Sequence, residues 1–111
     1  MIYLASPYSD PDPTIRQARY EEAVRYAARL WAEGKIVFSP IAHSHPIALH
    51  GIDGQWKQWQ EFDCTIIRAC SEMWILMLPG WEQSRGIAAE TAYAATIGLP
   101  IAYVQWTNNE R

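Results

Sequence analysis

The chain has 111 residues, which fits a single domain (residues 1–111) able to bury a core without disulfides or metals. Half of the residues are apolar and 19% are charged, a balance typical of folded rather than disordered chains. The formal net charge of −3 argues against non-specific binding to a nucleic acid polymer.

The sequence contains no pattern that directs it to a membrane. No apolar run approaches the roughly 20 residues that span a bilayer. Residues 1–5 lack the cationic segment of a secretory signal. We therefore expect no membrane partner and a cytoplasmic location. Cys64 and Cys70 have the spacing of neither a metal site nor a disulfide framework, which favours a packing role.

The predicted elements alternate between strand and helix. They are a strand at 2–5, a helix at 14–33 closed by Gly34, a strand at 35–39, a long loop at 40–54, a helix at 55–70, a strand at 73–78, a helix at 84–97 and a strand at 101–104. The apolar strands indicate an α/β fold with a parallel sheet covered by helices on both faces. Ligands of such folds bind outside the carboxyl ends of the strands, so the loops after Ala5, Ser39 and Leu78 should meet there.

Residues 80–90 form the most informative segment. They lead from a strand into a helix in which Glu90 is the only charged residue between residues 86 and 98. We expect this helix to be largely buried, and a carboxylate in such a helix needs a partner or a chemical role. Tyr3 of the first strand is placed to donate a hydrogen bond to Glu90, which would favour the ionised carboxylate. Ser84 is a favoured N-cap, and the helix start also suits a phosphate.

The predicted helix at 55–70 carries an acid on an apolar face. Its residues Trp56, Trp59, Asp63 and Ile67 share that face by their spacing of three and four. Asp63 is then an acid of the site, the partner of a cation such as Arg68, or a solvated residue at the edge of the helix face, and these interpretations stay open.

His43, His45 and His50 lie in the predicted loop and raise the hypothesis of a zinc site. The segment contains prolines and no cysteine, so the pattern favours ligand contact or loop anchoring by His43 or His45 over metal binding.

Six Trp and six Tyr indicate core and interface packing first, and stacking on a flat ligand second. Trp81, Trp106 and residues 108–109 are candidates for contacts between the subunits of a homo-oligomer.

Three segments with weak individual signals occur in a specific order. They are Tyr3-Leu-Ala-Ser-Pro-Tyr8, the run at 61–70 that contains Asp63, and Ser84-x-Gly86-x-x-x-Glu90 followed by Gly98-x-Pro100. Together they resemble the nucleoside 2-deoxyribosyltransferase superfamily, which includes the deoxynucleoside 5′-monophosphate N-glycosidases, over residues 2–104. Residues 39–46 and 79–81 resemble an uncharacterised bacterial branch of it. The resemblance implies a flavodoxin-like three-layer sandwich with a central parallel sheet of four or five strands.

The resemblance also implies roles for the site residues. Glu90 matches the nucleophile that attacks C1′ of a nucleoside or nucleotide, Tyr3 orients it, and Asp63 protonates the departing base. Ser84 stands where transferases have an aspartate and the monophosphate glycosidases a phosphate-binding serine, which implies hydrolysis of a 5′-monophosphate more than base exchange. This chemistry needs no metal or organic cofactor. The residues expected to bind substrate are Ser6 (a glycine in many members), Tyr8, His43, His45, Trp59, Gly80, Ser84 and Gly86.

Two other classes of function fit the same residues. One is a non-catalytic nucleotide-binding or sensing module that keeps the fold and the ligand site. The other is an interaction protein whose aromatic surface assembles an oligomer, with Glu90 in a structural role. NAD is an alternative substrate, because related NAD-cleaving enzymes have a similar glutamate at a strand end.

Overall fold

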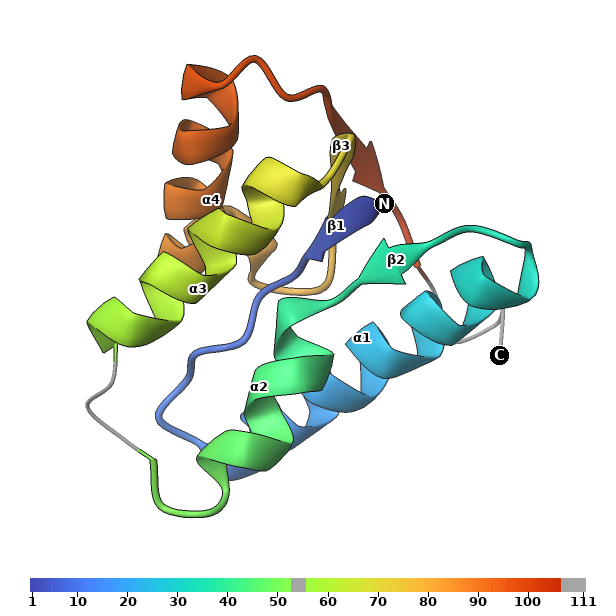
Figure 1. The fold of residues 1–111 in the computed structure, drawn as a ribbon. Helices are drawn as coiled ribbons and strands as arrows, with labels where there is room; N and C mark the ends of the chain where they lie inside the picture. The colour runs from blue at the N-terminus through green and yellow to red at the C-terminus, as the bar shows by residue number, and fades with distance from the viewer. Residues whose placement is uncertain (53–55, 107–111) are drawn as a thin grey trace.

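A parallel sheet forms the centre of the fold (Figure 1). The computed structural model describes residues 1–52 and 56–106, apart from the side chain of Trp56. Its strands are β1 (Ile2–Ala5), β2 (Val37–Phe38), β3 (Glu72–Leu76) and β4 (Ile101–Val104), in the order β2-β1-β3-β4. Every pair is parallel. The predicted α/β fold is therefore confirmed with a four-stranded sheet, consistent with a flavodoxin-like three-layer arrangement.

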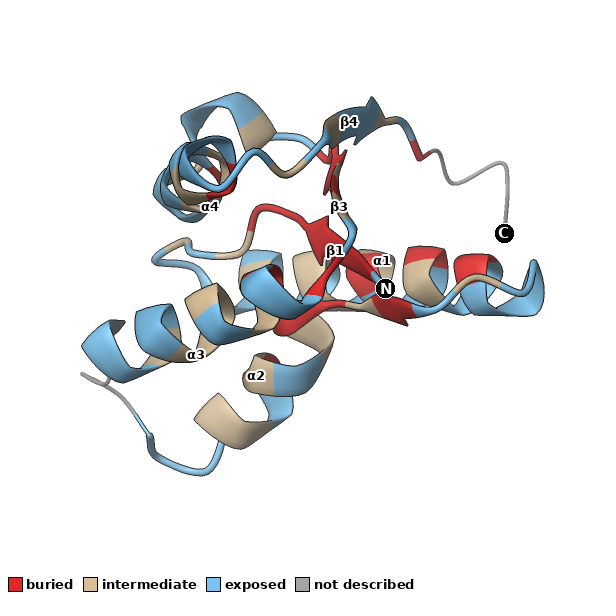
Figure 2. Ribbon diagram, turned by 45° about the horizontal axis from the view of Figure 1, so that its top comes forward, coloured by how far each residue is buried: buried red, intermediate tan, exposed pale blue. Residues whose placement is uncertain are grey.

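Helices lie on both faces of this sheet (Figure 2). Helix α1 (Pro13–Ala32) covers one face, and helices α3 (Trp56–Ala69) and α4 (Arg85–Thr96) cover the other. Strand side chains alternate between the faces, so the core has two parts. The α1 part contains Ile2, Leu4, Tyr26, Leu30, Val37, Leu76, Leu78 and Trp106, and the α3–α4 part contains Tyr3, Ala5, Ile67, Cys70, Met73, Ile75, Ile87 and Ala94.

Strand order places the ligand edge of the sheet. The chain leaves β1 toward β2 on one side, and β3 leads to β4 on the other. The connections therefore reverse direction between β1 and β3, and such a switch point opens a crevice at the carboxyl ends of the strands. The segments after β1 and β3 both begin at this edge.

The predicted loop at 40–54 is wrong for its first part, where α2 (Pro40–Ala48) forms. Ser39 caps this helix by accepting a hydrogen bond from the Ala42 N–H at 3.1 Å. Pro40 lies in the first turn, where a backbone N–H would have no partner within the helix, so its missing N–H removes no helical hydrogen bond. Pro46 predicts an interruption of the helix, because proline is unfavourable in helix interiors. In this nine-residue helix the cap and the packing against α1 outweigh that preference.

The expectation that the helix at 84–97 is largely buried is wrong for the single chain. Only Ile87 and Ala94 of α4 are buried, and its outer face is exposed. The exposed alanines of that face are Ala88, Ala89, Ala92 and Ala95. The low charge of α4 therefore reflects a small-residue outer surface. The edge strand β4 is also incompletely covered, because Ala102 and Tyr103 are exposed.

The chain returns to the α1 face after β4. Trp106 is buried there, packs edge-on against Tyr26 and donates from Nε1 to Glu22 Oε2 at 2.6 Å. Trp106 is therefore not available for the subunit contact expected of it, whereas Trp81 stays half-buried beside Tyr103. The expected contact by residues 108–109 lies outside the described residues. None of the helices that the structure describes is long and apolar enough to cross a membrane.

Candidate active site

A tyrosine and a glutamate form the centre of the site. Tyr3 lies in β1 with no exposed surface, and strand alternation directs its side chain to the face covered by α3 and α4. Glu90 lies in the second turn of α4. The Tyr3 hydroxyl donates a hydrogen bond to Glu90 Oε2 at 2.5 Å. The prediction that Tyr3 aims its hydroxyl at Glu90 is confirmed.

Burial controls the protonation of this pair. Loss of water raises the pKa of Glu90 to about 8; the hydrogen bond from Tyr3 opposes this shift, and the charge of Asp63 adds to it. Burial, together with the charge of Glu90, also raises the pKa of Tyr3, so the phenol stays neutral. The hydrogen bond alone favours an ionised Glu90, but desolvation outweighs it. In the free protein Glu90 is mostly protonated at pH 7.

Asp63 supplies a second acid on the same side of the sheet. It is half-buried on α3, and Ile67 one turn later is fully buried. Burial raises the pKa of Asp63 to about 6. Arg68, the cation considered as its partner, instead donates to the Tyr93 hydroxyl at 2.8 Å. No ion pair between Asp63 and Arg68 is therefore present among the described side chains.

Two buried oxygen atoms have no hydrogen-bond partner in the described part of the chain. They are Oδ1 of Asp63 and Oγ of Ser6, which directly follows β1. An unpaired buried polar atom costs free energy, and a ligand or a water molecule can remove that cost. Both residues come from the sequence-predicted site, and their unused hydrogen-bonding capacity marks them as candidate ligand contacts.

The loop after β1 is tied to two helices through His45. The Tyr8 hydroxyl donates to His45 Nδ1 at 2.6 Å, and His45 Nε2 donates to Gln17 Oε1 at 2.8 Å, because an amide oxygen only accepts. His45 is buried and stacks on Tyr20 at 4.4 Å. Burial lowers the pKa of His45, which keeps the ring neutral. With both nitrogens engaged, His45 anchors the loop, one of the two roles that its position suggested.

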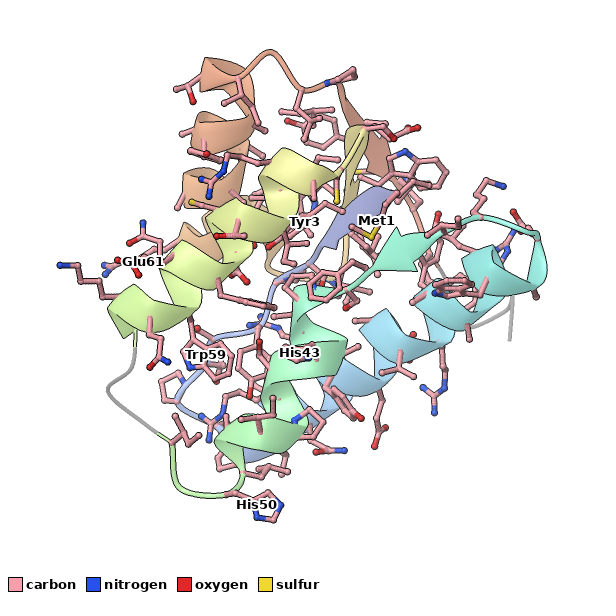
Figure 3. All side chains as sticks on the ribbon, in the orientation of Figure 1. Met1, Tyr3, His43, His50, Trp59 and Glu61 are labelled. Atoms are coloured by element: carbon pink, nitrogen blue, oxygen red, sulfur yellow. The ribbon has the colours of Figure 1, made fainter. Side chains whose placement is uncertain are left out.

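His43 belongs to a row of aromatic rings. It stacks on Phe62 of α3 at 5.1 Å, Phe62 meets Phe38 of β2 at 6.0 Å, and Phe38 lies 6.3 Å from Tyr3. Trp59 is half-buried and projects from α3 on the side that faces α2 (Figure 3). These rings connect the exposed His43 with the centre of the site.

The histidines are not arranged around a common point. His50 lies beyond the end of α2, far from Tyr3 (Figure 3), while His43 and His45 have the separate partners given above. Within residues 1–52 and 56–106, no group of three or more His, Cys, Asp or Glu side chains is placed to hold a metal ion.

The start of α4 lies after β3. Ser84 caps the helix as predicted, because its Oγ accepts a hydrogen bond from the Ile87 N–H at 3.2 Å. Gly86 lies in the first turn and Arg85 is exposed beside it. Gly80 has a φ of +92°, a left-handed conformation that favours glycine. This helix start is a polar site with a partial positive charge.

Arg19, which no sequence pattern singles out, contacts both loops of this edge. Its Nη1 donates to the Ser9 carbonyl at 3.0 Å, and its Nη2 donates to the Pro79 carbonyl at 3.3 Å. Arg19 lies among several charges on the polar side of α1, and only the fold brings Pro79 beside it. No local signal in the sequence distinguishes it from its charged neighbours.

Comparison with known families decides the classification of the chain. Residues 1–106 match the family described as "Domain of unknown function (DUF1937)". The chain belongs to this family. The match covers β1 through the segment that contains Trp106, so all the site residues above lie within it. A search of curated proteins found no match.

Proposed function

We propose that the protein cleaves or transfers an N-glycosidic bond of a nucleotide or nucleoside, with hydrolysis of a 5′-monophosphate as the main reaction. The observation that carries this proposal is the 2.5 Å hydrogen bond between the buried Tyr3 hydroxyl and Glu90. It holds one rotamer of a carboxylate at the carboxyl edge of a parallel sheet, where α/β proteins bind ligands. The unpaired Oδ1 of Asp63 supports a second acid nearby.

The reaction has two displacements. The Glu90 carboxylate attacks C1′, the C1′–N bond breaks, and its electron pair leaves with the base, which takes a proton from Asp63. Water then attacks C1′, gives a proton to the Asp63 carboxylate and releases Glu90. The products are a free base and a sugar 5′-phosphate. A buried carboxylate stabilises the oxocarbenium-like transition state because little water screens it.

The two carboxyl groups hold one proton between pH 6 and 8. With pKa values of about 6 and 8, Asp63 is mostly ionised and Glu90 mostly protonated in this range. The proposed reaction needs an ionised Glu90 and a protonated Asp63. This state also holds one proton on the pair. Positive charge on the reacting sugar favours ionised Glu90, so we propose that the proton moves to Asp63 when substrate binds.

Support for a phosphate comes from the start of α4. This helix start offers hydrogen-bond donors and positive charge at the same edge of the sheet. The groups are the Ser84 hydroxyl, the Arg85 guanidinium and the N–H groups of the first turn. The negative net charge of the chain favours a small anionic ligand over a polymer, because a polymer needs a broad basic surface.

A product assay tests the reaction. Purified protein is incubated with deoxy- and ribonucleosides, their 5′-monophosphates and NAD, and free base is separated by chromatography. We expect base release from a monophosphate, its loss in Glu90→Gln, and its retention in Glu61→Gln, which changes an exposed glutamate of α3 (Figure 3). If no free base is released from any compound of the panel at high protein concentration, the catalytic proposal is contradicted.

The raised pKa of Glu90 favours a second candidate, a nucleotide-binding or sensing module without catalysis. A protonated glutamate is a hydrogen-bond donor rather than a nucleophile. Calorimetry distinguishes the two: a sensing module binds a nucleotide with similar affinity before and after Glu90→Gln and never releases base.

We also propose that the protein forms a homo-oligomer. Beyond Arg85, the outer face of α4 is uncharged and exposed. Ile97 at its end is 43% exposed, and Tyr103 of the edge strand is 55% exposed. Light scattering coupled to size-exclusion chromatography measures the mass. A monomer at high concentration contradicts this proposal.

A further inference from the structure

The guanidinium of Arg19 lies where two loops of the site meet. It projects from the second turn of α1, and its Nη1 donates to the carbonyls of Tyr8 at 3.3 Å and Ser9 at 3.0 Å. Its Nη2 donates to the carbonyl of Pro79 at 3.3 Å. One side chain thus bonds the backbone of the loop after β1 and the backbone of the loop after β3.

The partners of Arg19 separate it from an ordinary surface arginine. All three are neutral carbonyls, and no ion pair of Arg19 with a carboxylate is found among the described residues. The guanidinium is a planar fork with five N–H donors, so it can serve carbonyls on two sides at once. Lysine has a single ammonium group and cannot reproduce this geometry.

Gly80 confirms how closely the second loop approaches. A Cβ built on Gly80 would lie 2.5 Å from Arg19 Nη2, too close for both to keep their positions. Gly80 also has a φ of +92°. The glycine therefore meets two requirements: a left-handed backbone, and space for the guanidinium.

We propose that Arg19 is a positioning residue that locks the loop after β1 to the loop after β3. The first loop carries Ser6 and Tyr8, and the second leads into Ser84 at the start of α4. This link between the two loops does not depend on which reaction the protein catalyses. Its effect on substrate binding rests on the function proposed above.

Amide hydrogen exchange of the full-length protein tests the lock. The N–H groups of Gln83 and Ser84 bond within the second loop, and that of Met77 bonds to β4. Arg19→Ala should speed exchange at Gln83 and Ser84 about tenfold, the effect of losing one net hydrogen bond to a charged donor, and leave Met77 unchanged. Arg25→Ala, which removes an exposed arginine of the same helix, should change none of them. Unchanged exchange at Gln83 and Ser84 in Arg19→Ala overturns the proposal.

A double-mutant cycle provides a second measurement. Gly34 has a φ of +86°, close to that of Gly80, but a Cβ there meets nothing within 4 Å. Gly34→Ala should raise the equilibrium constant of unfolding roughly tenfold from backbone strain, and Gly80→Ala by a larger factor because it also displaces Arg19. In the Arg19→Ala background the two glycine variants should become equal. Additive effects would show that Gly80 does not act on Arg19.

Kinetics connect the lock with the site. Arg19→Ala should raise KM for the best substrate about tenfold with little change in kcat, because Tyr3, Asp63 and Glu90 lie on other elements. A fall in kcat without a change in KM overturns this role. If no substrate is found, the proposed function fails, while exchange and the cycle still decide the lock.

Discussion

Two carboxyl groups with raised pKa values lie on the α3–α4 side of the sheet, together with one phenol. Burial is the main cause for all three groups, and the Tyr3 hydrogen bond only partly offsets it at Glu90. Shifted pKa values of this kind are common among the acids and bases of active sites. The titration of these groups is therefore a measurable property of the proposed site.

The rate of base release should depend on pH in a bell-shaped manner. The pair is fully protonated below pH 6 and fully ionised above pH 8, and neither state has both a nucleophile and an acid. We expect kcat/KM to fall about tenfold per pH unit on both limbs. Rates of the wild type between pH 4 and 10 measure this. A flat profile across that range contradicts the shared-proton scheme.

Tyr3→Phe should raise the pKa of Glu90 above its value of about 8, because the bond that favours the carboxylate is lost. The loss of the donor should also lower the free energy of unfolding by about 1–2 kcal/mol. Carbon-13 NMR of the Glu90 carboxyl carbon follows its titration. Tyr26→Phe, on the other face of the sheet, is the control and should not move it.

The contribution of Asp63 and Glu90 to the stability of the fold should fall as pH rises. The folded-state pKa values of Asp63 and Glu90 exceed their unfolded values near 4, so the unfolded chain releases protons that the folded chain keeps. This contribution is complete below pH 4 and is lost as pH rises toward 6 for Asp63 and toward 8 for Glu90. Asp63→Asn should therefore stabilise the protein relative to wild type at pH 8 by about 2 kcal/mol more than at pH 4, because the pKa of Asp63 differs by about two units between the folded and unfolded chain. Urea unfolding at the two values measures the difference, and an equal effect at both would contradict the raised pKa of Asp63.

At the scale of elements, serine caps begin two of the helices that border the site. Ser84 caps α4 and Ser39 caps α2, each through its Oγ. The two caps have the same chemistry, but only the α4 cap follows β3 and is proposed to contact phosphate. They form a natural matched pair for separating stability from binding.

Ser84→Ala and Ser39→Ala should each lower the free energy of unfolding by about 1 kcal/mol, the usual cost of losing a cap. Only Ser84→Ala should also raise KM for a 5′-monophosphate, while KM for the matching nucleoside stays the same. Urea unfolding and steady-state kinetics measure these effects. If both variants raise KM for both substrates alike, the phosphate role of Ser84 is wrong.

At the scale of the whole molecule, the segment after β4 closes the α1 face. Trp106 fills the space between α1 and the sheet and is linked to Glu22 by a hydrogen bond. Trp106→Ala should lower the free energy of unfolding by about 3–5 kcal/mol through a cavity and a lost partner. Trp31→Ala, at a residue 54% exposed, should cost less than about 1 kcal/mol. Equal losses in urea unfolding would contradict this packing.

The sequence alone determined the four strands, three of the four α-helices and the central pair of the site. Strands and amphipathic helices follow from the period of apolar residues. Gly34 follows the C-cap of α1 with a φ of +86°, the left-handed conformation predicted for it. The N-cap role of Ser84 follows from local chemistry. The Tyr3–Glu90 bond was also anticipated, because strand-end topology places a β1 side chain beside the helix that follows β3.

Tertiary structure decided what depends on neighbours distant in the sequence. The helix at Pro40–Ala48 forms although Pro46 is unfavourable inside a helix, because α1 packs beside it. The unpaired oxygen of Asp63 and the raised pKa of Glu90 exist because the surrounding elements exclude water. Arg19 becomes a link between two loops only where the fold brings Pro79 to it. Periodicity and capping are written within a few residues of the chain, whereas burial and contact are set by packing between segments far apart in it.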